Sequence, residues 1–64
     1  MTIEDLKDLI MDGNDVIVED LNHDCKVLFQ GTIDELEDDE LLELEVCNIN
    51  SEGDTIAINV EIED

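Results

Sequence analysis

The segment IAINVEIE at residues 56–63 decides the fold, because its side chains alternate between two kinds. Successive side chains of a β-strand point to opposite faces, so a repeat of two residues predicts a strand with one face against a core. One face carries Ile56, Ile58, Val60 and Ile62, and the other face carries Ala57, Asn59, Glu61 and Glu63. We expect a strand here, with its acidic face open to solvent.

The preceding segment repeats this alternation and predicts a hairpin. Leu42, Leu44 and Val46 alternate with Glu43, Glu45 and Cys47. The residues at 51–54, Ser-Glu-Gly-Asp, have the composition of a tight turn. Two antiparallel strands are therefore expected in the second half of the chain.

The first half predicts a second hairpin. Val16–Val18 is a β-branched run, and the side chains from Cys25 to Phe29 alternate again. The residues at 21–24, Leu-Asn-His-Asp, lie between these two strands and are expected to form the loop.

One helix is expected before each hairpin. Thr2 is a capping residue, acids follow it in the first turn, and apolar residues recur at helical spacing to about Met11. Thr32–Glu35 matches a capping box, so a short helix should begin there and fade near Glu40. The expected fold is one small α+β domain over residues 1–64 in the order α-β-β-α-β-β, an antiparallel four-stranded sheet with two helices on one face.

The charge balance restricts the function. The chain has 21 Asp and Glu against two Lys, a formal net charge of -19, yet its hydrophobic content of 42% with clear periodicity favours a folded domain over disorder. Affinity for phosphate comes from basic residues, so direct binding to nucleic acid is excluded, and an anionic membrane would repel the protein. No apolar run approaches the ~18 residues of a membrane span, and no leader pattern opens the chain, so we expect a cytoplasmic protein.

Acids are densest at residues 34–45, where eight of twelve positions are Asp or Glu. The net charge per unit length of a compact chain of this size resembles that of a DNA duplex and favours binding to a basic protein surface by nucleic-acid mimicry, although solubility is the simpler interpretation. The candidate partner-binding residues are Asp34, Glu35, Glu37, Asp38, Asp39, Glu40, Glu43, Glu45, Glu61 and Glu63.

The residues with soft-metal ligand atoms form a second candidate site. His23, Asp24, Cys25 and Cys47 could bind one zinc ion, which normally takes four ligands. The alternative is structural, because Cys25 is in phase with Val27 and would then be a small core residue.

Catalysis is not expected. Carboxylates are too abundant here to be diagnostic, and the chain has no phosphate-binding loop or nucleophile motif. His23 with either cysteine could form a nucleophile and base pair, but the acidic surroundings disfavour a thiolate.

Two segments carry a family resemblance: TIEDLK at residues 2–7 and GTIDEL at residues 31–36. With its small size and acidity, the chain resembles bacteriophage accessory proteins and is similar to type II-A anti-CRISPR proteins over its whole length. The resemblance implies an inhibitor, a monomer or weak dimer in the bacterial host, that docks on the basic channel of a guide-bound CRISPR effector nuclease and blocks loading of target DNA. It also implies that a metal is present in some members. The alternative is an acidic regulatory module that binds a basic host or phage protein unrelated to CRISPR.

Overall fold

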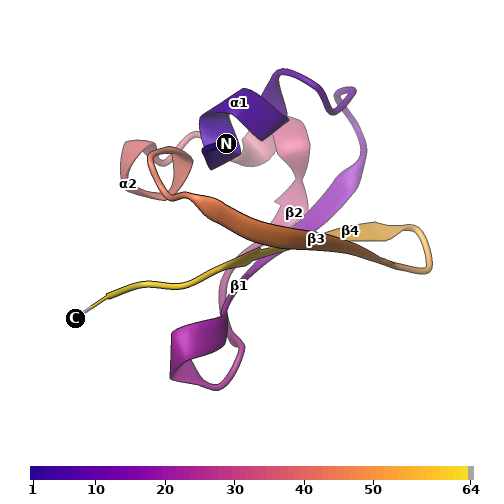
Figure 1. The fold of residues 1–64 in the computed structure, drawn as a ribbon. Coiled ribbons are helices and arrows are strands. Elements are labelled where there is room, and N and C mark those ends of the chain that lie inside the picture. Colours follow the sequence, from indigo (N-terminus) through magenta and orange to yellow (C-terminus); the bar gives the residue numbers. More distant parts are fainter. Residues whose placement is uncertain (64) are drawn as a thin grey trace.

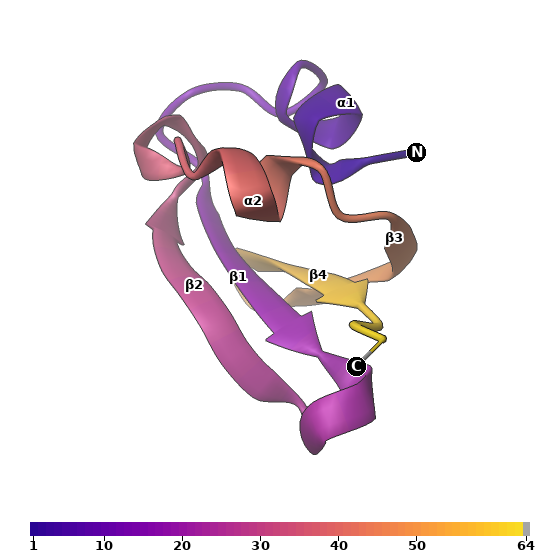
Figure 2. The same cartoon turned by 90° about the vertical axis from the view of Figure 1, so that its left-hand side faces the viewer.

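The chain forms a four-stranded mixed sheet with two short helices on one face (Figures 1 and 2). The computed structural model describes residues 1–63. Neither helix in this part of the chain is long and apolar enough to cross a bilayer. The elements are α1 (Ile3–Lys7), β1 (Asp15–Asp20), β2 (Lys26–Thr32), α2 (Asp39–Leu42), β3 (Val46–Glu52) and β4 (Thr55–Val60), with 3-10 turns at Leu21–His23 and Ile33–Glu35.

The strand order is β2-β1-β4-β3, and the central pair is parallel. The β1–β2 and β3–β4 pairs are antiparallel, as the hairpin patterns predicted. The expectation of a wholly antiparallel sheet is wrong, because β2 and β3 run in the same direction. Parallel strands need a crossover of about a dozen residues. Residues 33–45 provide this crossover over one face of the sheet.

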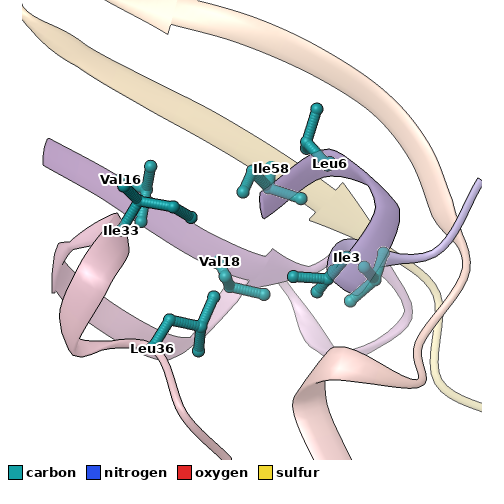
Figure 3. Packing of buried hydrophobic residues seen from close by; sticks show 8 residues of the cluster. Ile3, Leu6, Val16, Val18, Ile33, Leu36 and Ile58 are labelled. Atoms are coloured by element: carbon teal, nitrogen blue, oxygen red, sulfur yellow. The ribbon is translucent and has the colours of Figure 1, made fainter. Parts of the chain in front are cut away.

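The core lies between the sheet and this crossover (Figure 3). Val16, Val18 and Ile58 of the two central strands are fully buried. Ile3 of α1, together with Ile33 and Leu36 of the crossover, packs on them and is also fully buried. The fully buried hydrophobic side chains between the two layers are therefore all aliphatic.

The first helix is shorter than expected. Thr2 caps it and forms a capping box with Asp5, which confirms the predicted start. The helix ends at Lys7 and not near Met11, because the chain must leave the helical layer to reach β1. Leu9 and Met11 consequently lie in solvent, with 70% and 79% of their surface exposed.

The expected second helix is split into two pieces. Thr32 Oγ1 donates to Glu35 Oε1 at 2.7 Å, but only a 3-10 turn follows, with no backbone cap from the Thr32 side chain. Leu36 then adopts an extended conformation, which lets its side chain reach the core. The separate helix α2 begins after Asp38, whose carboxylate accepts from Glu40 N at 2.9 Å.

The third strand begins later than the alternation predicted, so the acids expected on the open face of the sheet do not lie in strands. Leu42 belongs to α2, and β3 starts only at Val46. The four acids assigned to the open face therefore lie outside the strands, and Glu52 is the only acid within β2, β3 and β4. The acids assigned to that face were Glu43, Glu45, Glu61 and Glu63.

Candidate acidic interaction surface

The crossover between β2 and β3 is fixed to the core along its length. Ile33 and Leu36 are fully buried, and three leucines farther along are partly buried against the same cluster. Ile33 N donates to Asn14 O at 2.9 Å, and Lys7 Nζ donates to Leu36 O at 2.8 Å. Acids on this segment are therefore displayed by an ordered backbone.

The acids of the crossover all point into solvent, and we call them the acidic layer. The acidic layer consists of Asp34, Glu35, Glu37, Asp38, Asp39, Glu40, Glu43 and Glu45, all of which are exposed. It comprises eight of the ten predicted partner-binding residues. The remaining two, Glu61 and Glu63, are also exposed but follow the end of β4 and are not part of the crossover.

Half of the acidic layer takes part in local hydrogen bonds. Asp34 Oδ1 accepts from Gly13 N at 2.9 Å, and this bond is the largest reason why the pKa of Asp34 is lowered from its usual value. Glu35 and Asp38 accept the bonds described above, and Glu45 pairs with the N-terminal amine at 3.2 Å. These four carboxylates help to hold the crossover in place.

The other four carboxylates of the acidic layer have no bonding partner within the described part of the chain. Within residues 1–63, the carboxylates of Glu37, Asp39, Glu40 and Glu43 have no hydrogen-bond or ion-pair partner. Unengaged carboxylates on an ordered backbone can accept bonds from lysine or arginine without first breaking internal ones. We therefore expect these four to contribute most to recognition.

The N-terminal segment extends the same charged side of the molecule, which the sequence reasoning missed. Thr2 bridges to Glu45, and Gly13 bonds to Asp34, so residues 1–14 adjoin the crossover. This segment adds four exposed acids. Part of the signal was present in Glu4 and Asp5 of the predicted first turn, which were interpreted only as marking the start of a helix. The four exposed acids of the segment are Glu4, Asp5, Asp8 and Asp12.

The negative charge is poorly compensated inside the molecule. In the part of the chain that the structure describes, the ion pairs are those of the N-terminal amine with Glu45 and of His23 with Asp20. Lys7 donates to a carbonyl group, and Lys26 is exposed at the start of β2. Nearly all of the formal charge is thus presented to solvent or to a partner.

Screening by salt should stabilise such a molecule. Between roughly 10 mM and 1 M salt the Debye length falls from about 30 Å to about 3 Å. The first value is comparable to the 31 Å long axis of the protein. We expect the melting temperature to rise by about 10 °C, equivalent to roughly 2 kcal/mol. Calorimetry at a series of sodium chloride concentrations measures this, and a constant melting temperature would contradict strong self-repulsion.

The predicted metal ligands lie at one end of the sheet but do not converge. His23 and Asp24 lie in the β1–β2 connection, Cys25 follows them, and Cys47 lies in β3, two strands away from β1. His23 Nδ1 bonds to Asp20 at 2.5 Å. Across residues 1–63 no three His, Cys, Asp or Glu side chains gather in an arrangement that could hold a metal ion. Both cysteines are exposed, so the alternative assignment of Cys25 to the core is wrong.

Zinc binding stays a prediction that elemental analysis can decide. The prediction expects about one zinc ion per chain or per dimer after dialysis, lost in both His23→Ala and Cys47→Ala. Trace zinc in the unmutated protein would contradict it.

Asp20, a buried carboxylate that the sequence did not indicate, lies at the same end of the sheet. Asp20 is only 2% exposed, and its Oδ1 accepts from Asn22 N at 3.0 Å and from Ile62 N at 3.1 Å. Burial alone would raise the pKa of Asp20, but the bonds from Ile62, His23 and Asn22 lower it below its usual value. Asp20 thereby ties the segment after β4 to the β1–β2 connection.

The lowered pKa gives a signed pH dependence. A carboxylate whose folded pKa is depressed adds stability above its unfolded pKa, and this stability is lost as the pH falls through the folded value. We expect Asp20→Asn to melt at a lower temperature at neutral pH and to lose less stability on acidification below about pH 4. Thermal melts from pH 2 to 7 measure both effects. Equal losses on acidification in the two proteins would exclude this role of Asp20.

Comparison of the chain with protein-family models, with curated proteins and with solved structures gives no match.

Proposed function

We propose that this protein is an inhibitor that binds a basic surface of a type II CRISPR effector nuclease in the cytoplasm of a bacterial host. The acidic layer takes the place of DNA phosphates, and target DNA is prevented from loading. The observation that carries the proposal is the ordered set of four unengaged carboxylates on the crossover, at Glu37, Asp39, Glu40 and Glu43.

The charge density supports nucleic-acid mimicry. The Cα trace extends 31 Å along its longest axis, and the formal net charge is -19. A DNA duplex of that length carries about 18 charges, at one per ~1.7 Å. A groove that accepts a duplex would therefore meet a similar total charge on this protein.

The distribution of charge supports docking through one side. Twelve of the acids lie in residues 1–14 and 33–45, four in the first range and eight in the second. The three strands β2, β3 and β4 carry one acid among them. A basic surface is consequently attracted to the helical side and steered towards it before contact.

Binding kinetics with a guide-loaded type II effector test the proposal. Electrostatic steering predicts an association rate that falls steeply between about 50 mM and 500 mM salt, while the dissociation rate changes much less. An association rate independent of salt would contradict recognition by charge.

A pull-down from a bacterial lysate separates the proposal from the regulatory alternative. Recovery of the CRISPR effector supports the inhibitor. Recovery of a basic transcription or assembly protein without the effector would favour a regulatory module that binds that protein.

A further inference from the structure

Strand β3 forms an open edge of the sheet. It pairs with β4 on one side and is last in the strand order β2-β1-β4-β3. Six of its seven residues are exposed, whereas several residues of β2, the other edge strand, are partly covered. Figure 1 shows β3 running along the outside of the molecule. Val46 N donates to Met1 O, and the outer backbone groups of β3 beyond Val46 are therefore available for pairing with an added strand.

The β3 edge lacks the charges that usually protect such an edge. Natural proteins commonly guard edge strands with lysine and other charged side chains, which prevent pairing with another chain. Residues 46–51 contain no charged side chain, although about a third of the whole chain is charged. The other edge begins with Lys26, a protecting residue of this kind. The register of β3 shifts between Val46 and Asn48, so the regular and uncharged part of this edge runs from Asn48 to Ser51, where no side chain protects it by charge.

Acids lie at both ends of this uncharged edge. Glu43 and Glu45 precede β3, and Glu52 and Asp54 end the strand and its turn; all four are exposed, but Glu45 already pairs with the N-terminal amine, so Glu43 is the unengaged acid at the first end. The six uncharged residues between them span roughly 20 Å at ~3.3 Å per residue. A strand laid along β3 would therefore meet carboxylates near its two ends and uncharged backbone between them.

The N-terminal residues already pair with the chain at the start of the β3 edge. Thr2 forms an antiparallel bridge with Glu45. Val46 N donates to Met1 O at 2.8 Å, and Ile3 N donates to Leu44 O at 3.0 Å. The N-terminal residues thus pair with the chain just before β3 and leave most of β3 beyond them.

We propose that the β3 edge binds an extended segment of a partner protein that carries lysine or arginine near its ends, by adding a strand to the sheet. Main-chain hydrogen bonds supply affinity in this mode of recognition, and the flanking carboxylates select basic side chains. A second copy of this chain is the poorer occupant, because pairing would bring together two molecules with a formal charge of -19 each. The inference shares with the proposed function only the basic character of the partner.

A synthetic peptide tests the proposal on the intact protein. The probe is KRVTVTVTRK, and the control peptide KRVPVPVTRK has the same charge but cannot form a continuous strand. Amide hydrogen exchange by nuclear magnetic resonance reads the β3 amides directly. We expect the probe to slow exchange of outward-facing β3 amides about tenfold or more, and the control peptide to leave them unchanged.

Two matched variants locate the binding edge. Ile49 in β3 and Val27 in β2 are 45% and 49% exposed, so each can be replaced by lysine at the surface with the same change in charge. Ile49→Lys should weaken probe binding about tenfold or more, and Val27→Lys by no more than about twofold. The melting temperature of each variant shows that it is folded.

Three results would overturn the proposal. The first is a probe that shifts only resonances of residues 34–45 and leaves exchange in β3 unchanged. The second is equal loss of binding in both lysine variants, and the third is protection of β3 by self-association of the protein alone. Failure of the effector to bind would instead remove the proposed function and leave the peptide result intact.

Discussion

Conversion of Glu37, Asp39, Glu40 and Glu43 to their amides is expected to weaken binding to the guide-loaded effector about 30-fold or more. These carboxylates have no internal partner among residues 1–63, so the change removes contacts with the partner and few within the protein. Four exposed ion pairs at roughly 0.5 kcal/mol each give about 2 kcal/mol, which is about 30-fold in affinity. Titration calorimetry at constant ionic strength measures the change.

The matched control neutralises four other exposed acids outside the predicted partner-binding set, at Asp15, Asp24, Glu52 and Asp54. Both variants change the formal net charge from -19 to -15, so a difference between them cannot come from net charge. We expect the control to lose no more than about threefold in affinity. Equal losses in the two variants would show that total charge, and not the acidic layer, determines binding.

Ile58→Ala is expected to abolish stable folding at low salt. Ile58 is fully buried in β4, between the central pair of strands and the helical layer. Replacing such a side chain by alanine costs about 2–5 kcal/mol, and a core of this size rarely supplies more than about 3–5 kcal/mol in total. Urea denaturation followed by circular dichroism measures the loss.

The control for this prediction is the same substitution on the paired strand. Ile49 lies opposite Ile58 in the β3–β4 register but is 45% exposed, so Ile49→Ala should cost about 1 kcal/mol or less. Directly paired residues lie on the same face of the sheet, so similar losses in the two variants would contradict the central position of Ile58 in the core and the peripheral position of Ile49.

The sequence predicted the elements better than their arrangement. The β4 segment and both hairpins follow from local alternation and turn composition, and the structure has these strands, but the face of β4 expected to be open is buried at Ala57 and Asn59. The direction of β1 relative to β4 depends on where the crossover leads, and alternation within a strand carries no information about that. The length of residues 33–45 was the available signal, because so long a connection suits a crossover better than a return at the same end.

Short apolar patterns gave wrong predictions where a helical turn and a strand would both place the same side chains in the core. Leu42, Leu44 and Val46 are all partly buried, although only Val46 lies in a strand, because a helical turn followed by extended chain turns all three towards the core. The capping box at Thr32 failed in a similar way. Burial of Leu36 required an extended residue where a helix would have continued.

The position of the acidic layer could be predicted from the sequence, but the internal partners of its carboxylates could not. The acidic layer follows directly from composition, since eight acids in twelve residues cannot all be buried. The carboxylates that have internal partners depend on tertiary contacts such as that between Gly13 and Asp34, which no local pattern reveals. The burial of Asp20 likewise depends on Ile62, which lies 42 residues away in the chain.

Cleavage of target DNA by a guide-loaded type II effector, with this protein added before or after the DNA, tests the proposed inhibition most directly. Competition for one basic surface predicts inhibition when the protein is added first and little inhibition when DNA is already loaded. It also predicts that the amide variant of Glu37, Asp39, Glu40 and Glu43 inhibits poorly in either order. Undiminished cleavage by several effectors at saturating protein would show that this protein does not inhibit them.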